Sequence, residues 1–184
     1  MMFSRVGQAR RGFLLGIVAL LAAGCATAAP DTTEAPNVVP IDAHLVTSGQ
    51  PSAKGLRGLR SQGFEAVIYL APSTVQDAIA EEPRILEAQG IEFVHIPIPF
   101  NAPDESHFLA VAEALGRLRE RKVLVHCQVN LRASSMVFLY RAIVEKQDPA
   151  RAYEAVARVW SPEGPWKALI AAELRKNGIA FEPY

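Results

Sequence analysis

The sequence predicts a single α/β domain with a mostly parallel central sheet of about four to five strands, flanked by helices. Short apolar segments of strand length alternate with longer segments in which apolar residues recur at helical spacing. Such alternation indicates strand-helix-strand connections, and therefore a sheet that helices cover on both faces. The predicted domain, residues 38–184, has the length of one ordinary domain and can bury a substantial core.

The strands are predicted from their apolar cores. Buried strands are expected at residues 65–70, 91–96 and 122–126, and an earlier strand at residues 42–47. Because ligands bind beyond the carboxyl ends of parallel strands, the functional site is expected just after one of these segments.

The segments between and after the strands are predicted to be helices. Two of them stop at Gly63 and Gly90. The helix over residues 133–146 is apolar on nearly all sides and is therefore expected to be buried. The predicted helices cover residues 52–62, 74–89, 103–121, 133–146, 149–160 and 164–177.

Residues 1–25 are predicted to be a signal peptide of the lipoprotein type. A basic start with Arg5, Arg10 and Arg11 precedes an apolar run over residues 13–23, which is too short to span a bilayer. The run leads into Leu-Ala-Ala-Gly-Cys, which resembles a bacterial lipobox with Cys25 as the lipidated residue. We therefore expect an exported protein of the periplasm or cell envelope, held at the membrane by a lipid anchor.

Other interpretations of this region compete with that one. Cleavage after Ala26-Thr27-Ala28 would release a soluble protein, and the Arg-Arg pair also resembles a twin-arginine export signal. A cytoplasmic N-terminal helix is a further alternative. Residues 26–37, polar and proline-bearing towards their end, are predicted to be a flexible tether between the anchor and the domain.

Charge and cysteine content narrow the function classes. The 19 basic and 19 acidic residues balance, and no basic block follows the signal peptide, so nucleic acid is not expected as a partner. If Cys25 is lipidated or removed, Cys127 has no partner for a disulfide. An unpaired thiol in an oxidising compartment calls for a functional explanation. The alternative is a buried cysteine that acts as a small apolar residue.

Cys127 stands where a catalytic thiolate would be expected. It follows the strand over 122–126 directly, and Arg132 lies just before the helix over 133–146. Unpaired amides at a helix N-terminus and a nearby guanidinium bind tetrahedral oxyanions. Such surroundings lower the pKa of a cysteine from about 8.5 into the range of roughly 3.5–7.5, which predicts a nucleophilic thiolate at neutral pH.

The stretch VHCQVNLRASS, residues 125–135, resembles the signature loop of cysteine-dependent protein tyrosine and dual-specificity phosphatases. Three further segments resemble parts of a bacterial subfamily of phosphatase-like domains: VTSGQP at 46–51, FEAVIYL at 64–70 and HIPI at 95–98. The resemblance implies a dual-specificity-phosphatase-like fold and a phosphate monoester substrate such as a phosphoprotein. It implies neither a metal nor an organic cofactor.

The resemblance also implies roles for the residues of this loop. Cys127 would attack the phosphate, and Arg132 would hold its oxygens together with the loop amides. His126 would shape the loop, and Ser134 would assist release of the thiolate. The residues expected to bind substrate are His126, Gln128, Val129, Asn130, Leu131, Ala133 and Ser134.

The loop departs from the family pattern in its length. Four residues, 128–131, separate Cys127 from Arg132 where the family has one more, so Ala133 occupies the usual arginine position. The segment CQVNLR also matches the loop length of rhodanese-like sulfurtransferases, in which the cysteine carries a persulfide. A non-catalytic phosphatase-like module that binds an anion or a partner is a third interpretation.

The proton donor for the leaving group is expected on the loop over residues 97–105. In the resembled family an aspartate on this loop is the general acid, which here implies Asp104. Asn101 is nearer the equivalent position but cannot donate a titrating proton. A structural interpretation competes, because Asp104 would stand near the start of the helix over 103–121, where a carboxylate stabilises the helix end.

The prediction that follows from the sequence is an exported cysteine-dependent phosphatase. It would hydrolyse phosphate monoesters, such as protein phosphotyrosine, through a phosphocysteine intermediate on Cys127.

Overall fold

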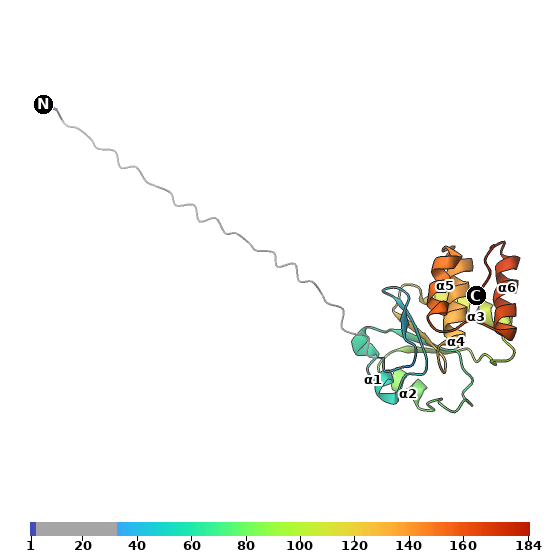
Figure 1. The fold of residues 1–184 in the computed structure, drawn as a ribbon. Helices are drawn as coiled ribbons and strands as arrows, with labels where there is room; N and C mark the ends of the chain where they lie inside the picture. The colour runs from blue at the N-terminus through green and yellow to red at the C-terminus, as the bar shows by residue number, and fades with distance from the viewer. Residues whose placement is uncertain (3–32) are drawn as a thin grey trace.

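The computed structural model describes residues 1–2 and 33–184, and its α/β domain is built on one five-stranded sheet (Figure 1). The strands follow the order β1-β2-β5-β3-β4, and all neighbouring pairs are parallel except β1 and β2. The strands span Val39–Pro40 (β1), Leu45–Ser48 (β2), Ala66–Tyr69 (β3), Glu92–His95 (β4) and Val123–His126 (β5). The predicted mostly parallel sheet is confirmed, with β1 as an added antiparallel edge strand.

The register of the parallel strands brings their last residues into one row. Tyr69 of β3 pairs with His126 of β5 on one side and with His95 of β4 on the other. Ser48 of β2 also pairs with His126. Cys127 follows β5 directly, so it lies at the carboxyl edge of the central strand. This is the edge at which ligands bind in α/β sheets.

Helices cover both faces of the sheet (Figure 1). The larger group, α3 to α6, packs on one face, and the short helices α1 and α2 pack on the other. The helices span Ala53–Arg57 (α1), Glu82–Glu87 (α2), Glu105–Leu118 (α3), Leu131–Leu139 (α4), Pro149–Ala157 (α5) and Gly164–Lys176 (α6). A 3-10 turn follows α1 at Arg60–Gln62 (η1), and a π-helical turn continues α4 at Tyr140–Val144 (η2).

Alternating strand residues divide the hydrophobic core into two parts. In β5, Val123 and Val125 belong to the core under α3 to α6, whereas Leu124 belongs to the core under α1 and α2. Every residue of α4 from Arg132 to Leu139 is buried, which confirms the buried helix predicted from its apolar sequence. Close packing on all sides therefore fixes the N-terminus of α4 beside the end of β5.

The helix predicted over residues 74–89 is much shorter in the structure. α2 begins only at Glu82, and the residues before it form turns and bends. Pro83 explains the difference, because it fits the first turn of a helix but would clash with the preceding turn inside a longer one. The helix predicted over 52–62 is likewise divided, since α1 ends at its cap Gly58.

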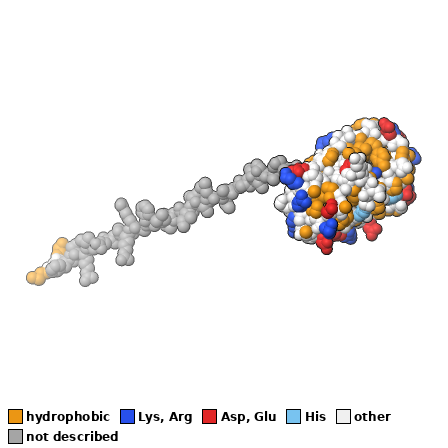
Figure 2. All heavy atoms as spheres, turned by 90° about the horizontal axis from the view of Figure 1, so that it is seen from below, with side chains coloured by type: hydrophobic (Ala, Val, Ile, Leu, Met, Phe, Trp, Pro, Cys, Tyr) orange, Lys and Arg blue, Asp and Glu red, His pale blue; other side chains and the backbone are white. Residues whose placement is uncertain are grey.

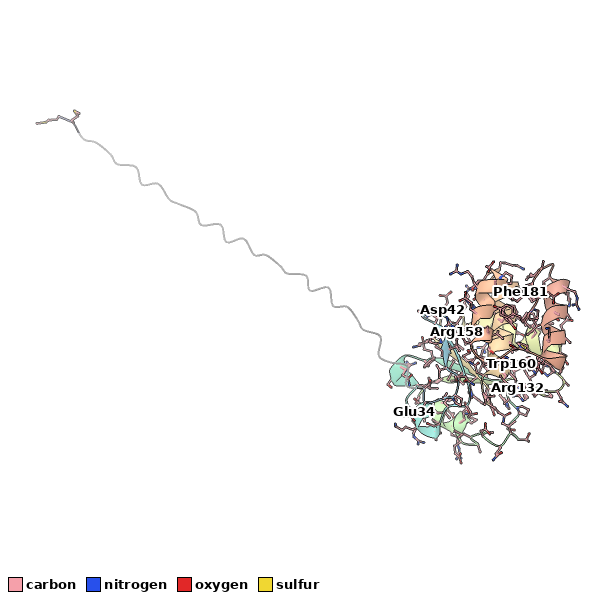
Figure 3. The ribbon with its side chains drawn as sticks, in the orientation of Figure 1. Glu34, Asp42, Arg132, Arg158, Trp160 and Phe181 are labelled. Carbon is pink, nitrogen blue, oxygen red and sulfur yellow. The ribbon has the colours of Figure 1, made fainter. Side chains whose placement is uncertain are left out.

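Residues 33–37, predicted as the end of a flexible tether, instead pack against the domain. Thr33 is fully buried, and a Cβ on Gly55 would come within 2.0 Å of its carbonyl oxygen. The Glu34 carboxylate accepts a hydrogen bond from Lys54 Nζ at 2.5 Å beside α1 (Figure 3). These contacts make residues 33–37 part of the folded domain and correct the predicted boundary at residue 38.

Most of the N-terminal predictions concern residues that the structure does not describe. Cys25, the remainder of the predicted signal peptide after Met2, and the predicted tether up to residue 32 lie outside the described residues. Within the described part of the chain, no helix is both long and apolar enough to cross a membrane.

The surface of the domain carries charges of both signs. On the face shown in Figure 2, acidic and basic side chains are interspersed with hydrophobic ones. Some charged side chains of the domain are paired: Arg117 and Arg121 both donate to Glu92, at 2.5 and 2.7 Å. The mixed surface agrees with the balanced composition of the sequence.

Candidate active site

Cys127 lies at the centre of the carboxyl edge of the sheet. Its side chain is buried, with 0% of the residue exposed. Its backbone N–H donates to Ser48 O at 3.3 Å, which continues the contact with β2 past the last residue of β5. Residues 128–130 then form the loop, and α4 begins at Leu131. The thiol therefore stands between a strand end and a helix N-terminus.

The first turn of α4 has backbone amides without a partner in the helix. The Ser134 amide donates to Asn130 O at 3.0 Å and begins the hydrogen bonding of the helix. The amides of Leu131, Arg132 and Ala133 come before it and therefore have no intrahelical acceptor. Together with the partial positive charge of the helix N-terminus, these amides can hold an oxyanion.

Asn130 holds the turn that connects the loop to the helix. Its backbone is left-handed, with φ 72°, a conformation that asparagine tolerates better than most residues. Its Nδ2 donates to Asn37 O at 2.6 Å and to Thr47 Oγ1 at 3.0 Å. In return, Asn37 Nδ2 donates to Val129 O at 3.0 Å. These hydrogen bonds between Asn37 and the loop tie the loop to the segment before β1.

Backbone contacts with the end of β2 fix the other side of the loop. The Gln50 amide donates to Gln128 O at 2.9 Å, and a Cβ on Gly49 would lie 2.7 Å from the same oxygen. Glycine is therefore needed at position 49 by the close approach of two backbone segments. Because the C=O and the next N–H of a planar peptide point in opposite directions, the Val129 amide points away from Gln50.

Arg132 is buried under the loop that follows β4, with 4% of the residue exposed. Its Nε donates to Ile98 O at 2.9 Å, and its guanidinium carbon lies 5.0 Å from the centre of the Phe100 ring. Ile98 O is its only hydrogen-bond partner among residues 33–184, so both Nη nitrogens are free to bind an oxyanion. Ala133, at the usual arginine position, is fully buried and offers only its amide.

The ring of Phe100, which lies beside the guanidinium of Arg132, belongs to a cluster of three aromatic rings. The centres of Phe100, Trp160 and Trp166 are 5.8–6.4 Å apart, and Trp160 is labelled in Figure 3. Trp166 is buried and donates from Nε1 to Phe100 O at 2.8 Å, so it anchors the loop by packing. Phe100, in contrast, exposes 41% of its surface. Its ring provides an exposed apolar contact next to the cationic group.

His126, the residue before the cysteine, belongs to a buried polar network. Its Nε2 lies 2.7 Å from Glu82 Oε1, and Gln50 Nε2 donates to Glu82 Oε2 at 2.9 Å. The imidazole stacks on the ring of Tyr69, with centres 4.8 Å apart. Burial, followed by the nearby Glu82 and Cys127, raises the pKa of Tyr69 to about 12, so its hydroxyl keeps its proton.

The remaining residues predicted to bind substrate lie at the start of α4 and at the rim of the loop. Ser134 is buried in the first turn of α4, where its hydroxyl donates to Leu131 O at 3.3 Å. Gln128 is partly exposed and Val129 is 40% exposed, so both border the solvent. In residues 33–184, no group of 3 or more His, Cys, Asp or Glu side chains is arranged to hold a metal ion.

Asp104 is the N-cap of α3. Its Oδ1 accepts from Ser106 Oγ at 2.6 Å and from the His107 amide at 3.1 Å, and His107 Nδ1 accepts from the Asp104 amide. The hydrogen bonds from Ser106, and then from His107, hold the pKa of Asp104 below its usual value. These contacts form a capping box, which agrees with the structural interpretation of this residue. They favour an ionised carboxylate, whereas a general acid needs its proton.

Sequence reasoning missed two residues of the site, Glu82 and Asn37. Glu82 contacts a residue 44 positions further along the chain, and Asn37 contacts one 93 positions away. Pro83 marks the helix start at which Glu82 stands and was the one local signal for its position. Asn37 lies in a stretch whose polar composition is typical of a linker, so the composition predicted a flexible tether there and not a residue of the site.

The fold and the site together define the class of cysteine-dependent tyrosine and dual-specificity phosphatases. A family model described as DSP-PTPase phosphatase fused to NAD+ kinase matches residues 28–166. The match covers most of the chain, and the chain therefore belongs to this family. No curated protein matches it in sequence.

Solved structures agree with this assignment. A phosphatase-like protein (DUF442) from Shewanella putrefaciens CN-32 is 27% identical, with a TM-score of 0.72 over 79% of this chain and 94% of that one. Tk-PTP in its active form is 26% identical, with a TM-score of 0.60 over 77% and 95% of the two chains. The PP-IP phosphatase SIW14 from S. cerevisiae shares the fold, at 15% identity and a TM-score of 0.62 over 78% and 86%. The chain is thus a phosphatase-like hydrolase of the tyrosine and dual-specificity kind.

Proposed function

We propose that the protein hydrolyses phosphate monoesters through a phosphocysteine on Cys127. The observation that carries the proposal is the buried thiol between the end of β5 and the free amides of α4, with Arg132 in the first turn of that helix. The helix N-terminus and the guanidinium favour an ionised sulfur and provide donors for the phosphate oxygens.

The reaction has two steps. The Cys127 sulfur attacks phosphorus and the bond to the leaving oxygen breaks, which gives a phosphocysteine and a released alcohol or phenol. The amides of residues 131–133 and the Nη nitrogens of Arg132 hold the equatorial oxygens, where charge accumulates in the transition state. Water then attacks the phosphocysteine, which releases inorganic phosphate and restores the thiolate.

The substrate we propose is an aryl phosphate, such as phosphotyrosine in a protein. Asp104 is tied up as a helix cap, so the leaving group must depart with little help from a fixed acid. A phenol, with a pKa of about 10, leaves as its anion far more readily than an aliphatic alcohol does. The exposed ring of Phe100 beside Arg132 also offers a stacking contact for an aromatic leaving group.

The proposal is tested on the purified protein with an aryl phosphate, and separately with thiosulfate and cyanide. Phosphate release that vanadate blocks and Cys127→Ser abolishes would support it. Thiocyanate formation would instead indicate the rhodanese-like sulfurtransferase, and phosphate binding without either reaction would indicate a non-catalytic module. Phosphate binding by Cys127→Ser serves as the control that the variant is folded.

We further propose that the protein is exported and anchored to a membrane through lipidated Cys25. The support is the basic, apolar and lipobox-like pattern of residues 5–25. Incorporation of a labelled fatty acid in a bacterial host, lost in Cys25→Ala, tests the proposal. An unlabelled soluble protein that begins after Ala28 would instead support the rival cleavage site.

A further inference from the structure

Glu82 is a carboxylate buried beside His126, the residue before the candidate nucleophile, and catalysis as outlined above does not use it. Only 1% of the residue is exposed. A buried carboxylate is destabilising unless it is paired and hydrogen-bonded. Here each oxygen has one partner, His126 Nε2 at 2.7 Å and Gln50 Nε2 at 2.9 Å. The position of α2, which begins at Glu82, thus serves to deliver this carboxylate to the edge of the sheet.

The contact with Glu82 decides which ring nitrogen of His126 carries a proton. When the carboxylate is ionised it only accepts hydrogen bonds, and Nε2 is then the nitrogen that donates. The other nitrogen, Nδ1, is buried and has no hydrogen-bond partner among the described residues. Protonation of Nδ1 would therefore create an imidazolium paired with Glu82, next to Cys127 in the chain.

The imidazole is also held in orientation from the side. Tyr69 stacks on it with an interplanar angle of 20°, and His95 stacks on the far face of Tyr69 at 15°. The three rings end neighbouring strands of the sheet, β5, β3 and β4. Such a row leaves His126 little freedom to turn, so Glu82 acts on a ring of fixed position.

We propose that Glu82 is a positioning residue that acts through His126: it fixes the ring with Nε2–H towards the carboxylate and favours its protonated form, which stabilises the Cys127 thiolate. The sequence gives no hint of this pair, because its members lie 44 residues apart. The inference builds on the proposed role of Cys127 as nucleophile. Its test, however, reads the thiol and the imidazole directly and requires no turnover.

The first experiment compares Glu82→Gln with Glu81→Gln in the full chain. Glu81 is the adjacent glutamate, but it is exposed and its side chain makes no capping hydrogen bond, so it is a matched control. The thiolate is followed by its ultraviolet absorbance against pH, after subtraction of the same protein carrying Cys127→Ser. We expect the midpoint of the Cys127 titration to rise by about one pH unit in Glu82→Gln and to stay at the wild-type value in Glu81→Gln.

The comparison isolates Glu82 because the other ionisable groups are unchanged. Tyr69 of β3, Arg132 of α4 and Asp77 of the segment between β3 and α2 lie in the same electrostatic neighbourhood. All are present in both variants. Equal midpoints in Glu82→Gln and Glu81→Gln would overturn the proposal.

The second experiment needs no variant of Glu82 and covers the case that Glu82→Gln does not fold. If a protonated His126 stabilises the thiolate, the thiolate must stabilise protonated His126 by the same amount. The ring nitrogens and protons of His126 are therefore titrated by NMR in the wild type and in Cys127→Ser. We expect the imidazole to lose its proton at a lower pH in Cys127→Ser. Coincident titrations, or a spectrum with the hydrogen on Nδ1 alone, would refute the role of Glu82.

Discussion

The two loops that meet at the candidate site are built in different ways. At the end of β5 and in the loop after it, the side chains of His126 and Asn130 are buried and bonded to partners distant in the sequence. In the loop after β4, Phe100 and Asp104 are exposed, and Asp104 bonds only to residues of its own helix start. The half of the site that would hold the phosphate is therefore preorganised by long-range contacts of its side chains, whereas the half that would meet the leaving group exposes Phe100 and Asp104 to solvent.

Replacement of Arg132 should produce the largest effect, because it removes the guanidinium that would bind the phosphate oxygens. We expect Arg132→Lys to lower kcat/KM for an aryl phosphate by at least about 100-fold, since lysine lacks the planar fork that both binds Ile98 O and presents two Nη donors. Steady-state kinetics measure the effect. Arg151→Lys, at an exposed position of α5, is the matched control. A kcat/KM within severalfold of wild type would show that Arg132 only packs.

Replacement of Asn130 should have an intermediate effect, on stability. Two variants distinguish the contribution of its left-handed backbone from that of its side-chain hydrogen bonds. Asn130→Gly keeps the left-handed turn but loses both Nδ2 hydrogen bonds, and we expect the free energy of unfolding to fall by about 1–3 kcal/mol. Asn130→Ala adds the strain of a positive φ, which costs roughly 1–2 kcal/mol more. Urea unfolding of both variants measures the difference. Equal stabilities would mean that the turn relaxes and that φ at this position is not constrained.

Asp104 should give the smallest effect on catalysis. Loss of a true general acid slows the reaction by about 100-fold or more, but we expect Asp104→Asn to change kcat by no more than about threefold. The alkaline limb of the pH-rate profile should also keep its position. A large fall in kcat that is greatest for poor leaving groups would restore Asp104 as the acid.

The same variant should show a pH-dependent change in stability. The pKa of Asp104 is lowered in the folded state, so its ionised form stabilises the fold above the unfolded pKa, and this contribution is lost as the pH falls through the folded pKa. Asparagine keeps the capping oxygen without the charge. We therefore expect the Tm of wild type to exceed that of Asp104→Asn at neutral pH, with a gap that closes in acid. A gap independent of pH would point to lost geometry rather than lost charge.

The sequence predicted what depends on local periodicity and missed what depends on distant contacts. Apolar runs identified the parallel strands β2 to β5 and the buried α4, because burial leaves its pattern within a few residues. The edge strand β1 is only two residues long and leaves no such pattern. Glu82 was hidden in a segment with helical spacing, and its partner is set by the packing of α2 on the sheet. Asn37 was hidden in a polar stretch whose hydrogen-bond partners lie far away in the sequence.

The fit of Thr33 against Gly55 has a practical consequence for recombinant work. A fragment that starts at residue 38 would lack the carbonyl of Asn37 that Asn130 needs, and would expose the surface of α1 that Thr33 covers. An affinity tag fused there would sit against the cysteine loop. Weak activity of such a shortened protein would then reflect where it was cut, and fusions that retain Thr33 and the residues after it avoid the problem.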